Sequence, residues 1–277
     1  MVLYIRCILW GHFTFKLFIM CYKILAIFYF VFTFFCFSQT NNSAVGKINY
    51  EYVSNYTFKK VNRPSTLLFS ENNSVFINSK GDEPIVYMNG VNFRDGYYVQ
   101  DKIGNLIFKD FIKDSIRIRK LVNTEPYVSK ENLPKFEWKI KDTTKQIGSF
   151  NCRLATTSFR GRNYSAWFTE KIPFADGPWK FSGLPGMILE VVSEDNDYQF
   201  LFRSVEMPIK SKNENITFNE DGTYLDFEKF KTADDIEFQK MKKQGEARWL
   251  SSGGKPGGYT LTKNPTNPIE LSYDKDN

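Results

Sequence analysis

Short stretches of alternating polar and apolar residues, separated by turn residues, are the feature that most constrains the fold of this 277-residue chain. Over residues 47–52, the side chains of Ile48, Tyr50 and Tyr52 alternate with charged or amide side chains. This two-residue period puts the apolar side chains on one face and predicts a half-buried strand. Aromatic residues, which favour strands, make up 17% of the chain.

The same alternation recurs along most of the sequence and predicts an antiparallel sheet. Pairs of alternating segments flank short turn sequences and indicate hairpins: 65–69 with 74–78, 97–100 with 105–108, 151–159 with 164–169, and 187–193 with 198–205. Another strand is predicted where charged residues alternate with Phe136, Trp138 and Ile140. We therefore expect a mainly β fold, a single antiparallel curved sheet or incomplete barrel of about ten to twelve strands.

One segment near 226–246 has a helical pattern instead. Residues Thr232 to Asp235 are typical of a capping box. Four apolar residues would share one face of the helix: Phe227, Phe230, Phe238 and Met241. We expect this helical segment to pack on the sheet and cover apolar surface. The Gly- and Ser-rich segment 251–258 that follows predicts a flexible loop.

The N-terminal residues have the pattern of a secretory signal. Residues 24–37 are apolar or nearly so and carry no charge, Lys23 precedes them, and Ser38 follows them. This run is shorter than the roughly 20 residues of a membrane-spanning helix. We therefore predict a signal peptide over 1–38, with Met20 as an alternative start, and one β-rich domain over 39–277. A retained anchor is the alternative, and it is the only membrane contact that we expect.

Removal of this segment would leave few residues for common catalytic or metal sites. The single His is His12, and of the four Cys only Cys152 lies beyond residue 38. Ser-His-Asp and Cys-His catalysis need an imidazole, zinc sites need His or Cys ligands, and one Cys cannot form an intramolecular disulfide. We therefore expect no metal and no cofactor, and a non-catalytic protein is favoured.

The charge pattern indicates no nucleic-acid partner. The net charge of the chain is +6, and loss of Arg6, Lys16 and Lys23 with the signal would lower it to +3. The remaining charges are interspersed, whereas nucleic-acid binding requires a clustered basic surface.

The segment 173–186 differs from the rest of the chain because it is rich in both Pro and Gly. It contains three Pro, three Gly, Trp179 and two Phe. Pro lacks the backbone donor and Gly loses more entropy on ordering, so the segment cannot form a long helix. Gly177-Pro178 and 183–186 are turn signals that restrict the backbone. The sequence predicts an ordered crossover held by aromatic side chains.

This segment carries a specific resemblance. Residues 183–188, Gly-Leu-Pro-Gly-Met-Ile, resemble the signature of the GLPGLI family of exported bacterial proteins, with Met187 in place of Leu. The supporting matches are Trp167-Phe168-Thr169, Ile172-Pro173, Gly177-Pro178-Trp179-Lys180-Phe181, Leu189-Glu190, 148–152, 159–162 and 267–270. The resemblance is strongest over 136–205. It implies an exported envelope protein of unassigned molecular function, with some relatives encoded near outer-membrane transporters.

The signature admits two interpretations. As a packing device, it would be held by a set of structural residues: Trp167, Pro173, Gly177, Pro178, Gly183, Pro185, Gly186 and Glu190. As a recognition surface, it would present aromatic residues beside a cation, a combination typical of binding sites. The candidate binding residues are Trp179, Lys180, Phe181 and Leu184, together with Arg160 and Arg162 at a predicted hairpin tip, which could bind an anionic group.

These patterns leave three classes of function open. The favoured one is a non-catalytic binding or interaction module of the cell envelope, accessory to an outer-membrane transporter. The alternative is a carrier of a lipid or other apolar ligand, which requires an apolar cavity. The least favoured is a carboxylate-dependent hydrolase, for which Glu170 and Glu190 are the candidate pair. Residues 194–197 carry calcium-type oxygen ligands, but they lie where a hairpin turn is expected.

Overall fold

The computed structural model describes residues 43–56, 59–78, 80, 85–87, 96–98, 101–122, 125–210, 214–260 and 270. The predicted signal peptide over 1–38, with His12 and Met20, lies outside the described residues.

Within the described ranges, no helix is long and apolar enough to cross a membrane.

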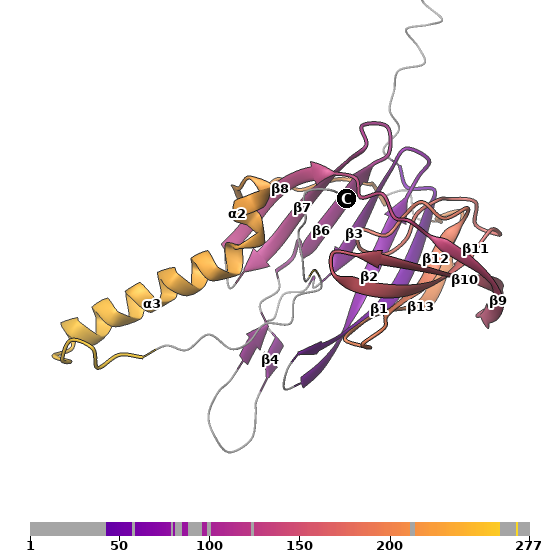
Figure 1. The fold of residues 1–277 in the computed structure, drawn as a ribbon. Coiled ribbons are helices and arrows are strands. Elements are labelled where there is room, and N and C mark those ends of the chain that lie inside the picture. The colour runs from indigo at the N-terminus through magenta and orange to yellow at the C-terminus, as the bar shows by residue number, and fades with distance from the viewer. Residues whose placement is uncertain are drawn as a thin grey trace, which may run out of the picture. The chain divides into compact units, whose positions relative to one another are not determined.

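The dominant element is one twelve-stranded sheet. The strands of the structure are β1 Gly46–Tyr56, β2 Lys59–Phe69, β3 Asn73–Asn78, β4 Ile85–Tyr87, β5 Gly96–Tyr98, β6 Asn105–Asp110, β7 Ser115–Val122, β8 Glu125–Asn132, β9 Lys139–Ile147, β10 Phe150–Phe159, β11 Arg162–Thr169, β12 Met187–Ser193, β13 Tyr198–Glu206 and β14 Thr223–Tyr224. The sheet order is β14-β8-β7-β6-β3-β2-β1-β13-β12-β11-β10-β9 (Figure 1), and β4 and β5 form a separate pair. Among the described strands, only the β14–β8 pair is parallel. The two end strands, β14 and β9, do not pair with each other, so the sheet is open. The expected mainly β fold is confirmed.

The two-residue alternation identified most strands correctly. Ile48, Tyr50 and Tyr52 are buried, whereas Lys47, Asn49 and Glu51 are only half-buried. Three of the predicted hairpins are present: β2 with β3, β10 with β11, and β12 with β13. Over 47–52 the alternation arises because β1 faces the apolar core with one side only, whereas β2 and β3 also bury Leu68 and Val75 in a second apolar cluster.

Two local predictions are wrong. The expected hairpin of 97–100 with 105–108 is absent, because β5 pairs with β4 while β6 pairs with β3 and β7. Phe136 and Trp138 precede β9 and do not form part of it. Alternation shows that a segment is extended, but it does not identify the strand beside it. At Phe136 and Trp138 the two-residue spacing allows the two rings to stack on each other, and neither residue belongs to a strand.

The core is built around Phe181, whose side chain is fully buried. Its ring lies 4.9 Å from Tyr164, 5.1 Å from Trp179, 5.2 Å from Phe136 and 6.2 Å from Phe200, measured between ring centroids. Tilted and edge-to-face contacts at these distances stabilise aromatic clusters beyond their area burial. Phe181 lies between β11 and β12, in residues 170–186, which we call the signature segment. This segment is therefore part of the core of the sheet.

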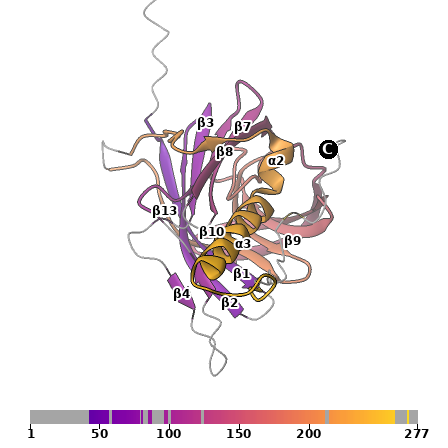
Figure 2. The ribbon, with the colours of Figure 1, turned by 90° about the vertical axis from the view of Figure 1, so that its left-hand side faces the viewer.

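Two helices follow the strands, α2 Phe227–Lys231 and α3 Ala233–Ser251. Asp226 caps α2 by accepting a hydrogen bond from the backbone N–H of Lys229. Helix α2 lies against β8, and the first turns of α3 contact the sheet through Ala233 and Glu237, the buried residues of that helix. The remaining turns project from the sheet (Figures 1 and 2). The predicted helical segment is thus present, with only its beginning packed on strands.

The segment after α3 is more ordered than its composition predicts. Trp249 Nε1 donates to the carbonyl of Lys255 at 2.9 Å. A Cβ atom built on Gly254 would lie 2.3 Å from the Trp249 ring, so only glycine fits at this contact. The glycines that suggested flexibility over 251–258 allow the turn to close on the indole.

Candidate functional site

Hydrogen bonds within the signature segment and at its end fold it into a compact connection, and not a crossover, between the neighbouring antiparallel strands β11 and β12. The amide of Gly183 donates to Ala175, Met187 to Ile172, and Ile188 to Asp176. Trp138 Nε1 reaches the segment from outside and donates to the carbonyl of Ser182 at 2.8 Å. These contacts place the predicted turn residues in a defined conformation.

Gly186 marks the closest backbone approach of the segment. Its φ is +150°, and a Cβ atom there would lie 2.3 Å from the carbonyl oxygen of Thr169. A Cβ atom built on Gly177 would likewise lie 2.8 Å from the side chain of Ile188. Of the other predicted structural residues, Pro178 is buried and Trp167 and Glu190 are half-buried, whereas Pro173, Gly183 and Pro185 are exposed.

A fully buried ion pair anchors the start of the segment. Lys109 of β6 forms an ion pair with Asp176, and its Nζ also donates to the carbonyls of Gly177 at 2.7 Å and Phe181 at 3.2 Å. The side chains of Lys109 and Asp176 are 0% and 2% exposed. Desolvation lowers the pKa of Lys109, and Asp176 opposes that shift.

A second group of charges lies beside the signature aromatics, and we call it the four-charge cluster: Glu131, Arg160, Lys180 and Glu270. Lys180 Nζ contacts Glu131 and lies 2.8 Å from Glu270 Oε1. Arg160 contacts Glu270 and lies 2.7 Å from Glu131 Oε2. Each cation therefore contacts both carboxylates, and the formal charges of the four residues sum to zero. All four side chains are at most 10% exposed.

Aromatic rings surround the cations of the four-charge cluster. Phe227 of α2 lies 5.1 Å from the Arg160 guanidinium and 5.6 Å from Lys180 Nζ. The rings of Phe159 and Trp179 lie 4.9 Å from Arg160 and 5.5 Å from Lys180, respectively. Each cation is attracted by the faces of these rings, and the contacts help to hold the cluster in place. Although burial opposes it, Glu270 and Glu131 raise the pKa of Arg160 above its ordinary value.

Glu270 is held ionised by this arrangement. Burial alone would raise the pKa of its carboxyl, but Lys180 and Arg160 lower the pKa below the ordinary value of 4.5. A carboxylate held in this way cannot act as a general acid near neutral pH.

The structure brings five of the six candidate binding residues to one place. Trp179, Lys180, Phe181 and Leu184 are buried in the core, and Arg160 joins Lys180 in the four-charge cluster. Arg162 is also buried but binds the β12–β13 turn, where it pairs with Asp195 and Asp197. A recognition role for these residues stays a prediction, and their burial favours the packing alternative.

Glu170 and Glu190, the candidate carboxylate pair, each contact a different cation. Glu170 pairs with Arg153 at 3.2 Å, and Glu190 pairs with Lys145 at 2.5 Å. At the 194–197 turn, Asp195 accepts from Ser193 Oγ at 2.6 Å and from the amide of Asp197 at 3.1 Å, as in a hairpin turn. Within the described ranges, no three His, Cys, Asp or Glu side chains are grouped to hold a metal ion.

Cys152 is buried in β10, and burial, reinforced by Glu190, raises the pKa of its thiol to about 11. A thiol with so high a pKa is not a nucleophile at neutral pH.

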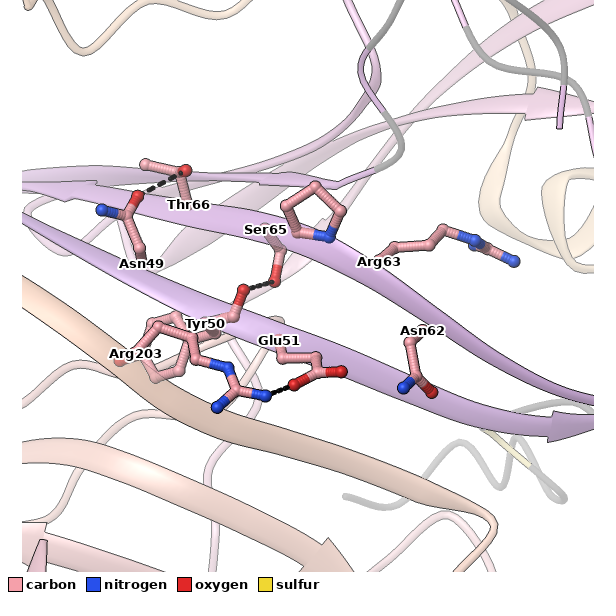
Figure 3. Close-up of a pocket in the computed structure, with 9 residues that line it drawn as sticks. Asn49, Tyr50, Glu51, Asn62, Arg63, Ser65, Thr66 and Arg203 are labelled. Carbon is pink, nitrogen blue, oxygen red and sulfur yellow. Dashed lines mark hydrogen bonds and ion pairs between the residues drawn. The ribbon is translucent and has the colours of Figure 1, made fainter.

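Two surface pockets are open to solvent. The larger, about 400 Å³, lies over β1, β2 and β13 and is lined in part by Asn49, Arg63 and Arg203 (Figure 3). Its side chains engage one another, since Arg203 pairs with Glu51 and Thr66 Oγ1 donates to Asn49 at 3.0 Å (Figure 3). The second, about 290 Å³, lies over β7, β8 and residues 220–224.

Sequence reasoning missed three residues of the two buried charge groups. Lys109, Asp176 and Glu131 were not singled out, because a charged residue in a strand or loop is usually solvated. One signal was available for Lys109, which follows the apolar run 106–108 where a buried side chain is expected.

A family model described as "Protein of unknown function (Porph_ging)" matches residues 160–190, which include the tip of the β10–β11 hairpin and the signature segment. No curated protein matches the chain. The GLPGLI resemblance itself remains an expectation.

Several solved structures are similar to the chain at low scores. Two structures of PNGF-II align with 18% identity and TM-scores of 0.46 and 0.47, over 67% and 68% of this chain. The chain spans about a third of the PNGF-II chains, 32% of each. A LolA superfamily protein from Nitrosomonas europaea aligns with 6% identity and a TM-score of 0.28, over 64% of this chain and 91% of that one. At these scores the similarities assign neither fold nor function.

The packing alternative for Trp179 predicts a large loss of stability on truncation. Trp179→Ala removes a ring that is only 8% exposed and contacts Phe159 and Phe181. We expect it to lower the free energy of unfolding by about 3–5 kcal/mol in urea denaturation. Ile112→Ala, at a side chain 70% exposed, is the control and should stay within about 0.5 kcal/mol of the wild type. A Trp179→Ala protein as stable as this control would instead support a surface role.

The lowered pKa of Glu270 predicts a pH-dependent effect of its removal. A carboxyl whose folded pKa is lowered stabilises the fold above its unfolded pKa, and this contribution is lost as pH falls through the folded value. We expect Glu270→Gln to cost about 3 kcal/mol at pH 7, because the buried cations lose a partner. The stability gap between wild type and variant should narrow below about pH 4.5, when measured by urea unfolding at several pH values. A gap that stays constant to pH 3 would contradict the assignment.

Proposed function

We propose that the protein is a non-catalytic binding module of the bacterial cell envelope, which binds a partner protein along the open edge of its sheet. The observation that carries this proposal is the exposure of β9. Eight of the nine residues of Lys139–Ile147 are exposed, and β9 lies at the end of the sheet, paired only with β10 among the described strands. A strand of this length with a free edge can accept a further strand from another chain.

The charge of β9 indicates the chemistry of the partner strand. It carries Lys139, Lys141 and Lys145 against the single acidic residue Asp142. Lysines on an edge oppose pairing with a second copy of the same strand, because like charges would lie opposite each other. An acidic segment would complement the edge and would also associate faster. The partner in this proposal is therefore an envelope protein that binds β9 through a segment rich in Asp or Glu.

Location in the envelope is supported by the signal-like pattern of 1–38, and an accessory role at an outer-membrane transporter by the GLPGLI resemblance. The buried state of the signature segment supports a scaffold role for it, with recognition at β9 instead. An apolar-ligand carrier would require an apolar cavity. Carriage of an apolar ligand remains the alternative outcome of the test.

Site-specific crosslinking tests the proposal directly. A photo-crosslinking amino acid at position 143, in the exposed part of β9, should capture a defined envelope protein in native cells. Lys139→Glu with Lys141→Glu should reduce that capture at least about tenfold, because it reverses the charge of the edge. The matched control is Lys113→Glu with Lys130→Glu, two exposed lysines elsewhere in the chain. Equal capture by both double variants, or copurification of lipid instead of protein, would overturn the proposal.

A further inference from the structure

Helix α3 is held to the sheet by its first turns. Glu237 accepts a hydrogen bond from the hydroxyl of Tyr127 on β8, and Asp234 forms an ion pair with Lys120 on β7. The turns beyond these contacts project from the sheet (Figures 1 and 2), and residues 239–251 are exposed or half-buried. The far part of α3 therefore presents its side chains to a surface outside the core of this fold.

The projecting part of α3 and the turn after it are strongly basic. Residues 239–258 have a net charge of +4, from five basic residues and one acidic residue: Lys240, Lys242, Lys243, Arg248, Lys255 and Glu246. The helix dipole favours cations only in the last turn of a helix, so it accounts for Arg248 but not for the lysines of 240–243. A projecting element with this charge attracts an anionic surface.

Two large apolar side chains lie beside these charges at the far end of α3. Trp249 is 40% exposed and Leu250 is 43% exposed. The indole Nε1 already donates to the carbonyl of Lys255 at 2.9 Å, so the ring can leave water without losing a hydrogen bond. Gly254 and Gly258 pack against the indole and hold it in place. Exposed Trp and Leu next to Lys and Arg are typical of segments that enter the headgroup region of a bilayer.

We propose that residues 248–255, which we call the α3 tip, bind the surface of an anionic lipid bilayer. Arg248 and Lys255 contact the headgroups, and Trp249 and Leu250 enter the boundary between headgroups and acyl chains. An acidic protein would also complement the charge. The internal hydrogen bond of the indole favours lipid, because acyl chains offer no acceptor to a buried indole N–H, whereas a protein interface usually supplies one. The α3 tip is separate from the β9 edge, and either proposal can fail without the other.

The binding test uses the full chain with an environment-sensitive fluorescent amino acid in place of Ser251, which leaves Trp249 and Leu250 unchanged. The probes are vesicles of phosphatidylcholine and phosphatidylglycerol in equal parts, and vesicles of phosphatidylcholine alone. The emission should shift to the blue at a lipid concentration at least about tenfold lower with the anionic vesicles. The same label at Ile112, a residue 70% exposed outside α3, should not shift, which separates the α3 tip from membrane contact through 1–38. Equal responses to the two kinds of vesicle, or equal shifts at the two positions, would overturn the proposal.

Charge reversal at the α3 tip tests which residues make the contact. Arg248→Glu with Lys255→Glu should raise the lipid concentration needed at least about tenfold, whereas Lys113→Glu with Lys130→Glu makes the same change outside α3 and should stay within about twofold of the unsubstituted chain. Leu250→Ser, at a side chain already in contact with water, should weaken binding but keep the melting temperature. Equal weakening by the two double variants would show that α3 does not make the contact. Capture of an acidic protein by a photo-crosslinker at position 251, with no blue shift on vesicles, would also overturn the proposal.

Discussion

Neutralisation of buried charge is the constraint on which the rest of this structure depends. Lys109 and Lys180 enter an interior made mostly of apolar side chains, where an unpaired ammonium would be strongly disfavoured. Asp176 pairs with the first, and Glu131 and Glu270 pair with the second. These carboxylates come from three separate parts of the chain. These ion pairs therefore connect strands β6 and β8, the signature segment and Glu270.

The signature segment owes its conformation to both packing and charge. Phe181 places it at the centre of the aromatic core, and Gly186 lets its backbone pass close to Thr169. Lys109 satisfies two carbonyls of the segment, those of Gly177 and Phe181, which would otherwise be buried without donors. A surface recognition loop would need neither this burial nor this internal pairing. We therefore place the proposed binding surface at the open edge of the sheet and not at the signature segment.

The strands could be predicted from sequence because burial of one face of a strand gives its apolar residues a two-residue period, as in 47–52. Which strands lie side by side could not be predicted in every case, since nothing in the local pattern of 105–110 specifies β3 and β7 as its neighbours. The residues of the signature were identified, but the sequence left both a packing role and a recognition role open, because Trp and Lys side by side are typical of both cores and surfaces. The partners Glu131 and Glu270 lie 49 and 90 residues from Lys180 in sequence, so only the fold reveals the cluster.

A double-mutant cycle on Lys109 and Asp176 tests the central role of buried charge most directly. Lys109→Met, Asp176→Asn and the double variant would be compared with the wild type by urea unfolding. Each single change should cost about 3–5 kcal/mol, because it leaves one buried charge unpaired. The double variant should be more stable than the sum of the single changes predicts, by at least about 2 kcal/mol. Costs that simply add, within about 0.5 kcal/mol, would show that the two charges do not depend on each other and would contradict the account.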